Sequence, residues 1–241
     1  MIMPMATVII TTTATMTTTT DLYRLLAWFS PSYPIGAFSY SHGVETAVEA
    51  GWVRDAATLS DWIGHILRHG AGWLDAVLLK EAYRAAGDPR RLDELADLAG
   101  AWRGTAETAL ESTQQGGSFL GVTRAAWGHE ALDAFAERRK GRPVPLCVAL
   151  GIAAQAHGLD LAAVMAAYLH AFAANLVSAA VRLIPLGQTD GQRSLQALMP
   201  VVDSVVPCAL ACDLEDCGTA ATMVDIASMM HETQYTRLFR S

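Results

Sequence analysis

Apolar residues recur at helical spacing along almost the whole chain after residue 21. In the segment 22–29, three leucines and Phe29 occupy positions i, i+3, i+4 and i+7, which lie on one face of an α-helix. Pro31 and Pro34 follow. Because proline lacks an amide hydrogen and restricts the residue before it, this pair predicts that the helix ends there and that the next segment is stiff.

A longer apolar stripe runs from residue 59 to residue 78. It keeps its phase across the glycine-containing stretch 69–73, so the pattern predicts one long helix with a weakened middle. Thr58 and Asp61 resemble a capping box at the start of this helix.

Helical patterns continue through the rest of the chain. Asp88 followed by Pro89 supplies an N-cap and a proline at the first helical position. The stretch 114–121 predicts a loop or a glycine-tolerant helix junction, and Asp160 and Asp190 are predicted caps. The remaining predicted helices span residues 118–138, 145–157, 160–183, 190–206 and 218–231.

This pattern determines the predicted fold class. No group of segments alternates apolar and polar residues as the strands of a sheet would, and no repeat or long linker divides residues 21–241. We therefore expect an all-α protein, a single-domain bundle of roughly eight to ten helices. Residues 1–20 are threonine-rich, lack the features of a signal peptide, and are predicted to be a disordered leader.

The segment 161–181 contains no formal charge and is long enough to cross a membrane. It is dominated by alanine, however, and His170 and Asn175 interrupt it. No aromatic belt flanks the segment either. These features favour a buried central helix, so no membrane partner is expected.

Composition and charge narrow the possible partners. Of the 241 residues, 52% are hydrophobic and only 17% are charged, so some apolar surface is expected to remain exposed until a partner covers it. The net charge is −7. The basic run 137–142 is interpreted as a solvated helix end, and no basic stripe follows any segment, which argues against a nucleic-acid partner.

Motifs for catalysis are absent. The sequence has no Walker A loop, no H-E-x-x-H, no G-x-S-x-G and no dinucleotide fingerprint. We therefore predict that the chain is not an enzyme and has neither catalytic residues nor a cofactor. A sequence with these features is more typical of a protein that works by binding.

Two groups of residues could in principle bind a metal. His65 and His69 are four residues apart on a predicted helix, a spacing that can direct two imidazoles to one ion. Cys208, Cys212 and Cys217 cluster in ten residues but match no zinc pattern, and a reduced thiol cluster is the favoured interpretation. No metal site is predicted, although direct metal binding stays open as an alternative.

Three polar segments differ from the apolar body. "SPSYPIGAFSYSHGVE" at 30–45 combines prolines and glycines with aromatic and hydroxyl side chains, which predicts a stiff corner. "RLIPLGQTDGQR" at 182–193 predicts a polar turn after a long buried helix, an arrangement typical of binding loops. The ending "HETQYTRLFRS" at 231–241 is rich in arginine and aromatic residues, as interface hot spots are. A connecting turn and a docked terminal helix are the simpler alternatives for the last two.

Together with "STQQG" at 112–116, these three segments resemble the urease accessory protein UreF family, and the resemblance covers residues 21–241 in order and spacing. It implies an all-α, non-hydrolytic cytoplasmic protein that acts in nickel delivery to urease. It also implies a homodimer that binds UreD (UreH in some systems), recruits the GTPase UreG and docks on apo-urease. The threonine-rich leader and the cysteines at 208–217 have no counterpart in that pattern.

We expect the corner at 30–45 to lie near the C-terminal tail, so that both contribute to a surface for partners. A rigid corner would reduce the entropy lost on association. The predicted partner-binding residues are Tyr33, Pro34, Gly36, Phe38, Tyr40, His42, Glu45, Arg182, Gln188, Gln192, His231, Glu232, Tyr235, Arg237, Leu238, Phe239 and Arg240.

Three hypotheses for function follow from the resemblance and the residues. The first is a scaffold that also regulates the GTPase. The second is that Arg237 or Arg240 completes the active site of UreG as an arginine finger, against the simpler interpretation of a salt-bridged anchor. The third is a chaperone that binds nickel directly through His65 and His69 or through the segment Cys208–Cys217.

Overall fold

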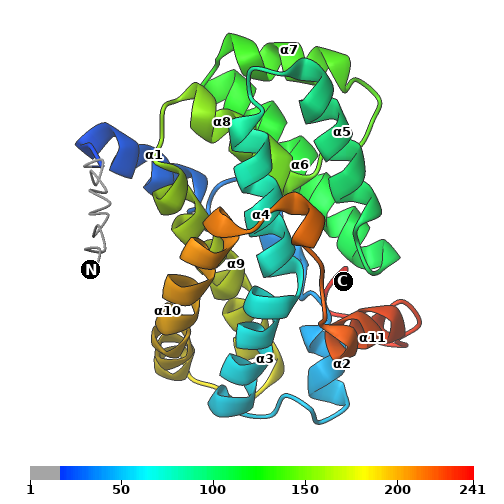
Figure 1. The fold of residues 1–241 in the computed structure, drawn as a ribbon. Coiled ribbons are helices and arrows are strands. Elements are labelled where there is room, and N and C mark those ends of the chain that lie inside the picture. Colours follow the sequence, from blue (N-terminus) through cyan, green and yellow to red (C-terminus); the bar gives the residue numbers. More distant parts are fainter. Residues whose placement is uncertain (1–16) are drawn as a thin grey trace, which may run out of the picture.

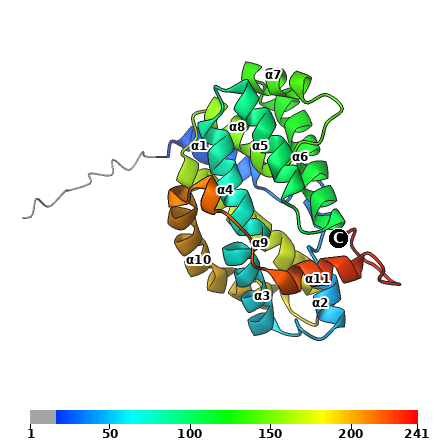
Figure 2. The ribbon, with the colours of Figure 1, turned by 45° about the vertical axis from the view of Figure 1, so that its right-hand side comes forward.

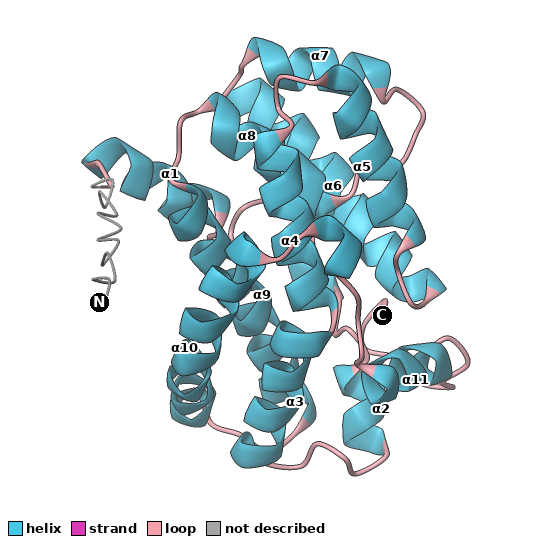
Figure 3. Cartoon of the chain, viewed as in Figure 1, coloured by secondary structure: helices cyan, strands magenta, loops and turns pink. Residues whose placement is uncertain are grey.

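Helices account for the regular structure of this protein. The computed structural model describes residues 17–241, and within them it contains no β-strand (Figures 1 and 3). The all-α prediction is confirmed. The α-helices are α1 Thr19–Trp28, α2 Val44–Glu49, α3 Ala56–His69, α4 Ala71–Arg84, α5 Pro89–Ala101, α6 Ala106–Ala126, α7 Glu130–Arg138, α8 Leu146–Ala156, α9 Leu161–Leu183, α10 Gln188–Ala211 and α11 Thr222–His231, with 3-10 turns at Ala37–Ser39 and Leu214–Asp216.

The core forms where α4 crosses α8 and where α9 packs against α10. Helix α6 lies against α8, while α3 lies against α10, and α11 packs on the short helix α2 (Figures 1 and 2). Buried leucine, alanine, valine and isoleucine side chains join these helices in one apolar cluster. The buried alanines are small side chains that allow the helices to approach closely.

The predicted long helix over 59–78 is two helices. Gly70 has φ −117° and ψ −144°, outside the helical region, and it separates α3 from α4. The first of them begins three residues before the stripe, because Asp55 is its N-cap. Asp55 accepts the amide of Thr58, and Thr58 completes a capping box with it. The predicted capping box of Thr58 with Asp61 was therefore wrong.

The glycine-rich stretch 114–121, expected to be a loop or junction, lies inside the continuous helix α6. Gly116 faces the backbone of residues 144–146 so closely that any Cβ at this position would overlap the carbonyl oxygen of Val144. The glycine therefore serves close packing between α6 and the segment before α8 rather than a turn. Asp190, expected to cap its helix, is the third residue of α10, which begins at Gln188.

Residues 1–16 of the predicted leader lie outside the described residues, and helix α1 begins at Thr19. By length and composition alone, α9 and α10 could each cross a membrane. Half of the apolar stretch of α9 is buried inside the fold, as the core helix of a bundle would be. The apolar stripe of α1 packs only in part, since Leu22 and Leu26 are exposed.

Candidate functional site

The C-terminal tail, residues 232–241, is docked against the corner at 30–45. The amide of Arg240 donates to the carbonyl of Ser39 at 2.8 Å, and the amide of Ser41 donates to the carbonyl of Ser241 at 2.6 Å. Ser241 is fully buried. Figure 2 shows the tail lying between α2, α11 and the foot of α6. The two segments that we expected to lie near each other are thus in direct contact.

The corner has an unusual backbone path. Gly36 and Gly43 adopt positive φ angles of 75° and 79°, and His42, directly before Gly43, adopts 54°. A positive φ is unfavourable for a residue with a side chain. His42 is held there by a 2.9 Å contact between its Nδ1 and Glu111 Oε2 and by an edge-on contact with Phe172.

Glu45, in the first turn of α2, is the main acceptor for the tail. Its carboxylate accepts the amide of Leu238 at 2.6 Å and the amide of Phe239 at 3.0 Å. The same carboxylate lies 3.1 Å from His231 Nε2. Glu45 is buried, and two amides and an imidazole surround its charge. This residue therefore fixes the path of the tail.

Two further carboxylates come from α6, and the sequence analysis did not single them out. Glu107 contacts His231 Nδ1 at 2.9 Å and accepts from Arg237 Nη1 at 3.1 Å. Glu111, one turn later, contacts His42 and accepts from Gln115 Nε2 at 3.2 Å. Their spacing of four residues places both on one helix face, which was the available sequence signal.

Arg182, at the end of α9, connects the third predicted segment to the tail. Its guanidinium lies over the ring of Phe239 with 4.3 Å to the centroid, and it donates to the carbonyl of Phe38 at 3.0 Å. This arrangement combines a cation–π contact with a hydrogen bond. Gln188 and Gln192 are instead exposed on the first turns of α10, and Gln192 borders a separate groove between α9 and α10.

The predicted site residues separate into buried and exposed groups. The buried ones cannot touch a partner while the tail is docked, and their contacts hold the tail in place instead. The exposed ones can touch a partner directly. The buried residues are Tyr40, His42, Glu45, His231 and Phe239, and the exposed ones are Pro34, Phe38, Arg182, Gln188, Gln192, Glu232, Tyr235, Arg237, Leu238 and Arg240, with Tyr33 and Gly36 half-buried.

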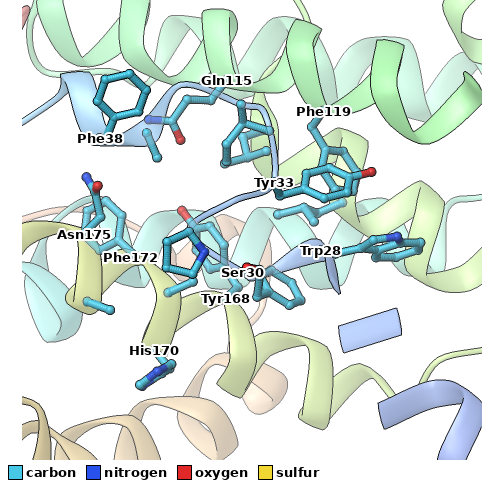
Figure 4. A pocket seen from close by; sticks show the side chains of 18 of the residues that line it. Trp28, Ser30, Tyr33, Phe38, Gln115, Phe119, Tyr168, His170, Phe172 and Asn175 are labelled. Carbon is cyan, nitrogen blue, oxygen red and sulfur yellow. The ribbon is translucent and has the colours of Figure 1, made fainter. Parts of the chain in front are cut away.

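A cavity of about 210 Å³ lies behind the corner, between it and helices α6, α8 and α9 (Figure 4). Its wall includes Trp28, Tyr33, Phe119 and Phe172. The hydroxyl of Tyr33 pairs with Thr123 Oγ1 at 2.8 Å. Burial raises the pKa of Tyr33, and the hydrogen bond to Thr123 opposes that rise. The aromatic side chains of the corner thus serve partly as packing.

Neither group of possible metal ligands forms a site. The rings of His65 and His69 lie 4.9 Å apart on the exposed side of α3. Cys208 is exposed, and burial raises the pKa of the half-buried Cys217 thiol to about 11. Among residues 17–241, no three histidine, cysteine or acidic side chains converge to hold a metal ion. The geometry therefore gives direct metal binding no support.

Fold and site together define an all-α protein whose distinguishing feature is a docked tail. Comparison with known proteins agrees with this class. The family profile UreF matches residues 53–199. The chain is 52% identical over 222 residues to the urease accessory protein UreF of Granulibacter bethesdensis, which covers 91% of this chain and 94% of that protein. It is 49% identical over 222 residues to the protein of the same name from Bradyrhizobium diazoefficiens, which covers 91% of each chain.

This chain belongs to the UreF family of urease accessory proteins. The family named by its relatives is the one that the segments 30–45, 182–193 and 231–241 resembled.

Proposed function

We propose that this chain is a non-enzymatic scaffold for urease maturation, required for nickel incorporation. In this proposal it binds UreD (UreH), recruits the GTPase UreG and regulates its GTP hydrolysis. The observation that carries the proposal is that the tail is docked on the corner. This docking brings exposed aromatic and basic side chains together above a buried cluster of polar residues. Family membership supports the role in urease assembly.

An apolar surface next to the tail supports protein binding. Helix α11 leaves a row of large side chains exposed, and the tail continues it with the fully exposed Tyr235 and with Leu238, which is 61% exposed. Exposed apolar patches rimmed by polar residues are typical of protein interfaces. The exposed side chains on α11 are Met223, Ile226, Met229 and Met230. We infer that this face contacts UreD.

A homodimer, docking on apo-urease and a cytoplasmic location belong to the same proposal and rest on the family alone. Arg237 pairs with Glu107, which favours the anchor interpretation over the arginine finger. Under the proposal, an Arg237→Ala variant that still binds its partners leaves the chemical step of UreG unchanged.

Co-expression with UreD tests the proposed surface. We expect Leu238→Asp to reduce co-purification of UreD by at least tenfold, because one charge placed in an apolar interface core costs roughly 2 kcal/mol or more. The matched control is Met199→Asp on α10, since Met199 is 60% exposed but belongs to a different surface. Equal retention of UreD by both variants would refute the assignment of this face.

A further inference from the structure

His231 is completely buried, and each of its ring nitrogens faces a different carboxylate. Nε2 lies 3.1 Å from Glu45 Oε2, and Nδ1 lies 2.9 Å from Glu107 Oε2. An ionised carboxylate only accepts hydrogen bonds, and a neutral imidazole carries a single N–H. Both contacts are therefore hydrogen bonds only when the ring is the doubly protonated imidazolium.

The charges around His231 balance in that state. Glu45 from α2 and Glu107 from α6 carry two negative charges, which the imidazolium and Arg237 of the tail neutralise. The other ionisable groups facing this region are Glu111 from α6, which pairs with His42 from the corner, and Asp225 from α11, whose pKa is raised by burial. Loss of the proton from His231 would leave one buried carboxylate without a counter-charge, which is strongly unfavourable.

We propose that His231 is a proton-dependent latch that keeps the tail docked. The imidazolium bridges α2 to α6 and holds the Glu45 carboxylate where the amides of Leu238 and Phe239 reach it. When the ring becomes neutral, one of the two bridges is lost, and Glu45 no longer holds the tail firmly. The docked state is thus favoured while the ring is protonated, and it weakens once the pH is raised far enough to remove that proton.

This inference concerns the chain alone and stands whether or not the proposed partners bind. Its consequence is that the exposed side chains Tyr235 and Leu238 are presented in fixed positions only while the latch is closed. Tail order, and with it any surface that depends on the tail, would then vary with pH without any change in the helical body.

Limited trypsin digestion of the full chain, with mass spectrometry of cleavage after Arg237, measures tail release. Digestion is done at two pH values, roughly 6 and 9. Each rate is divided by that of a free peptide of residues 232–241, which corrects for the enzyme's own pH dependence. We expect relative cleavage to be at least tenfold faster at the higher pH, since a charge-assisted buried bond is lost.

The variant His231→Gln cannot carry the charge, so its relative cleavage should be fast at both pH values. His65→Gln is the matched control, because His65 is exposed on α3, and it should behave as the unmodified chain does. Equal protection of the unmodified tail at both pH values, or full protection in a folded His231→Gln variant, would overturn the latch.

If His231→Gln does not fold, the cleavage rates of the unmodified chain at the two pH values still test whether His231 holds the tail. NMR of the histidine ring nitrogens adds an independent test: the signals of His231 should show two protonated nitrogens at the lower pH. A single protonated nitrogen there would also overturn the inference.

Discussion

At the scale of single residues, burial determines what the polar residues of the site can do. Tyr40, His42 and Glu45 look from the sequence like a surface that partners read. In the structure they are buried, and Glu45 orders the tail through two amides and an imidazole. The exposed Phe38 and Leu238 remain available for contact. The sequence predicted that the corner and the tail lie together, but it could not separate the residues that hold the tail from those that stay exposed.

Glu107 and Glu111 show why the sequence alone could not reveal which residues of the site are buried. In "ETALE" two glutamates four residues apart resemble an ordinary solvated helix face. What buries them is a histidine or a tail residue from the other end of the chain, at separations of 124 and 130 residues. Their spacing shows that the two glutamates share a helix face, but a local pattern carries no information about such distant neighbours, so it could not show that this face is buried in the site.

Glu107→Gln tests the energetic weight of this cluster. The change removes a charge that both His231 and Arg237 use, and we expect the free energy of unfolding to fall by about 3 kcal/mol, as when one partner of a buried ion pair is removed. Glu94→Gln is the control, because Glu94 forms only exposed pairs with Arg90 and Arg91 and should change stability by less than about 1 kcal/mol. Urea denaturation measures the free energy of unfolding of both variants. Equal losses of stability in Glu107→Gln and Glu94→Gln would contradict a stabilising role for the buried cluster.

At the scale of elements, periodicity predicted the helices well but their ends and breaks poorly. The segments now seen as α1, α8 and α9 were placed within a few residues. The apolar stripe at 59–78 kept its phase through Gly70, so it gave no sign that the chain changes direction there. Conversely, the glycines in 114–121 suggested a break, whereas Gly116 serves a tight contact within an unbroken helix.

Adjacent glycines of α6 allow a matched test of this contact. A Cβ at position 116 would overlap the backbone at Val144, whereas a Cβ at position 117 would meet nothing within 4 Å. We expect Gly116→Ala to destabilise the fold by about 2 kcal/mol through overpacking. Gly117→Ala should stabilise it by about 0.5–1 kcal/mol, because alanine favours a helix interior. Thermal unfolding of the two variants should show melting temperatures shifted in opposite directions, and a shared direction would contradict the packing argument.

At the scale of the whole molecule, we expect the helical body to be stable without the tail. The tail contributes no helix, since α11 ends at His231, and the apolar cluster that joins α3, α4, α8, α9 and α10 does not depend on it. The composition predicted exposed apolar surface, and α1 and α11 carry it.

Removing residues 232–241 tests this separation. We expect the truncated chain to keep its far-ultraviolet circular dichroism per residue, because the helices remain, and to lose co-purification with UreD. The control is Thr233→Ala, because Thr233 is an exposed tail residue outside the predicted partner-binding set, and this variant should retain both properties. A truncated chain that still captures UreD would show that the tail is dispensable for that contact.

The pairing of Ser41 with Ser241 joins residues 200 positions apart. Contacts of such long range form late in folding, because the intervening chain must first be arranged. During synthesis, the corner is made early. The tail can bind it only after almost every helix has been made. A chain that has been made only as far as α11 would therefore hold much of the apolar core while lacking the docked tail, and with it the surface that we propose for partners.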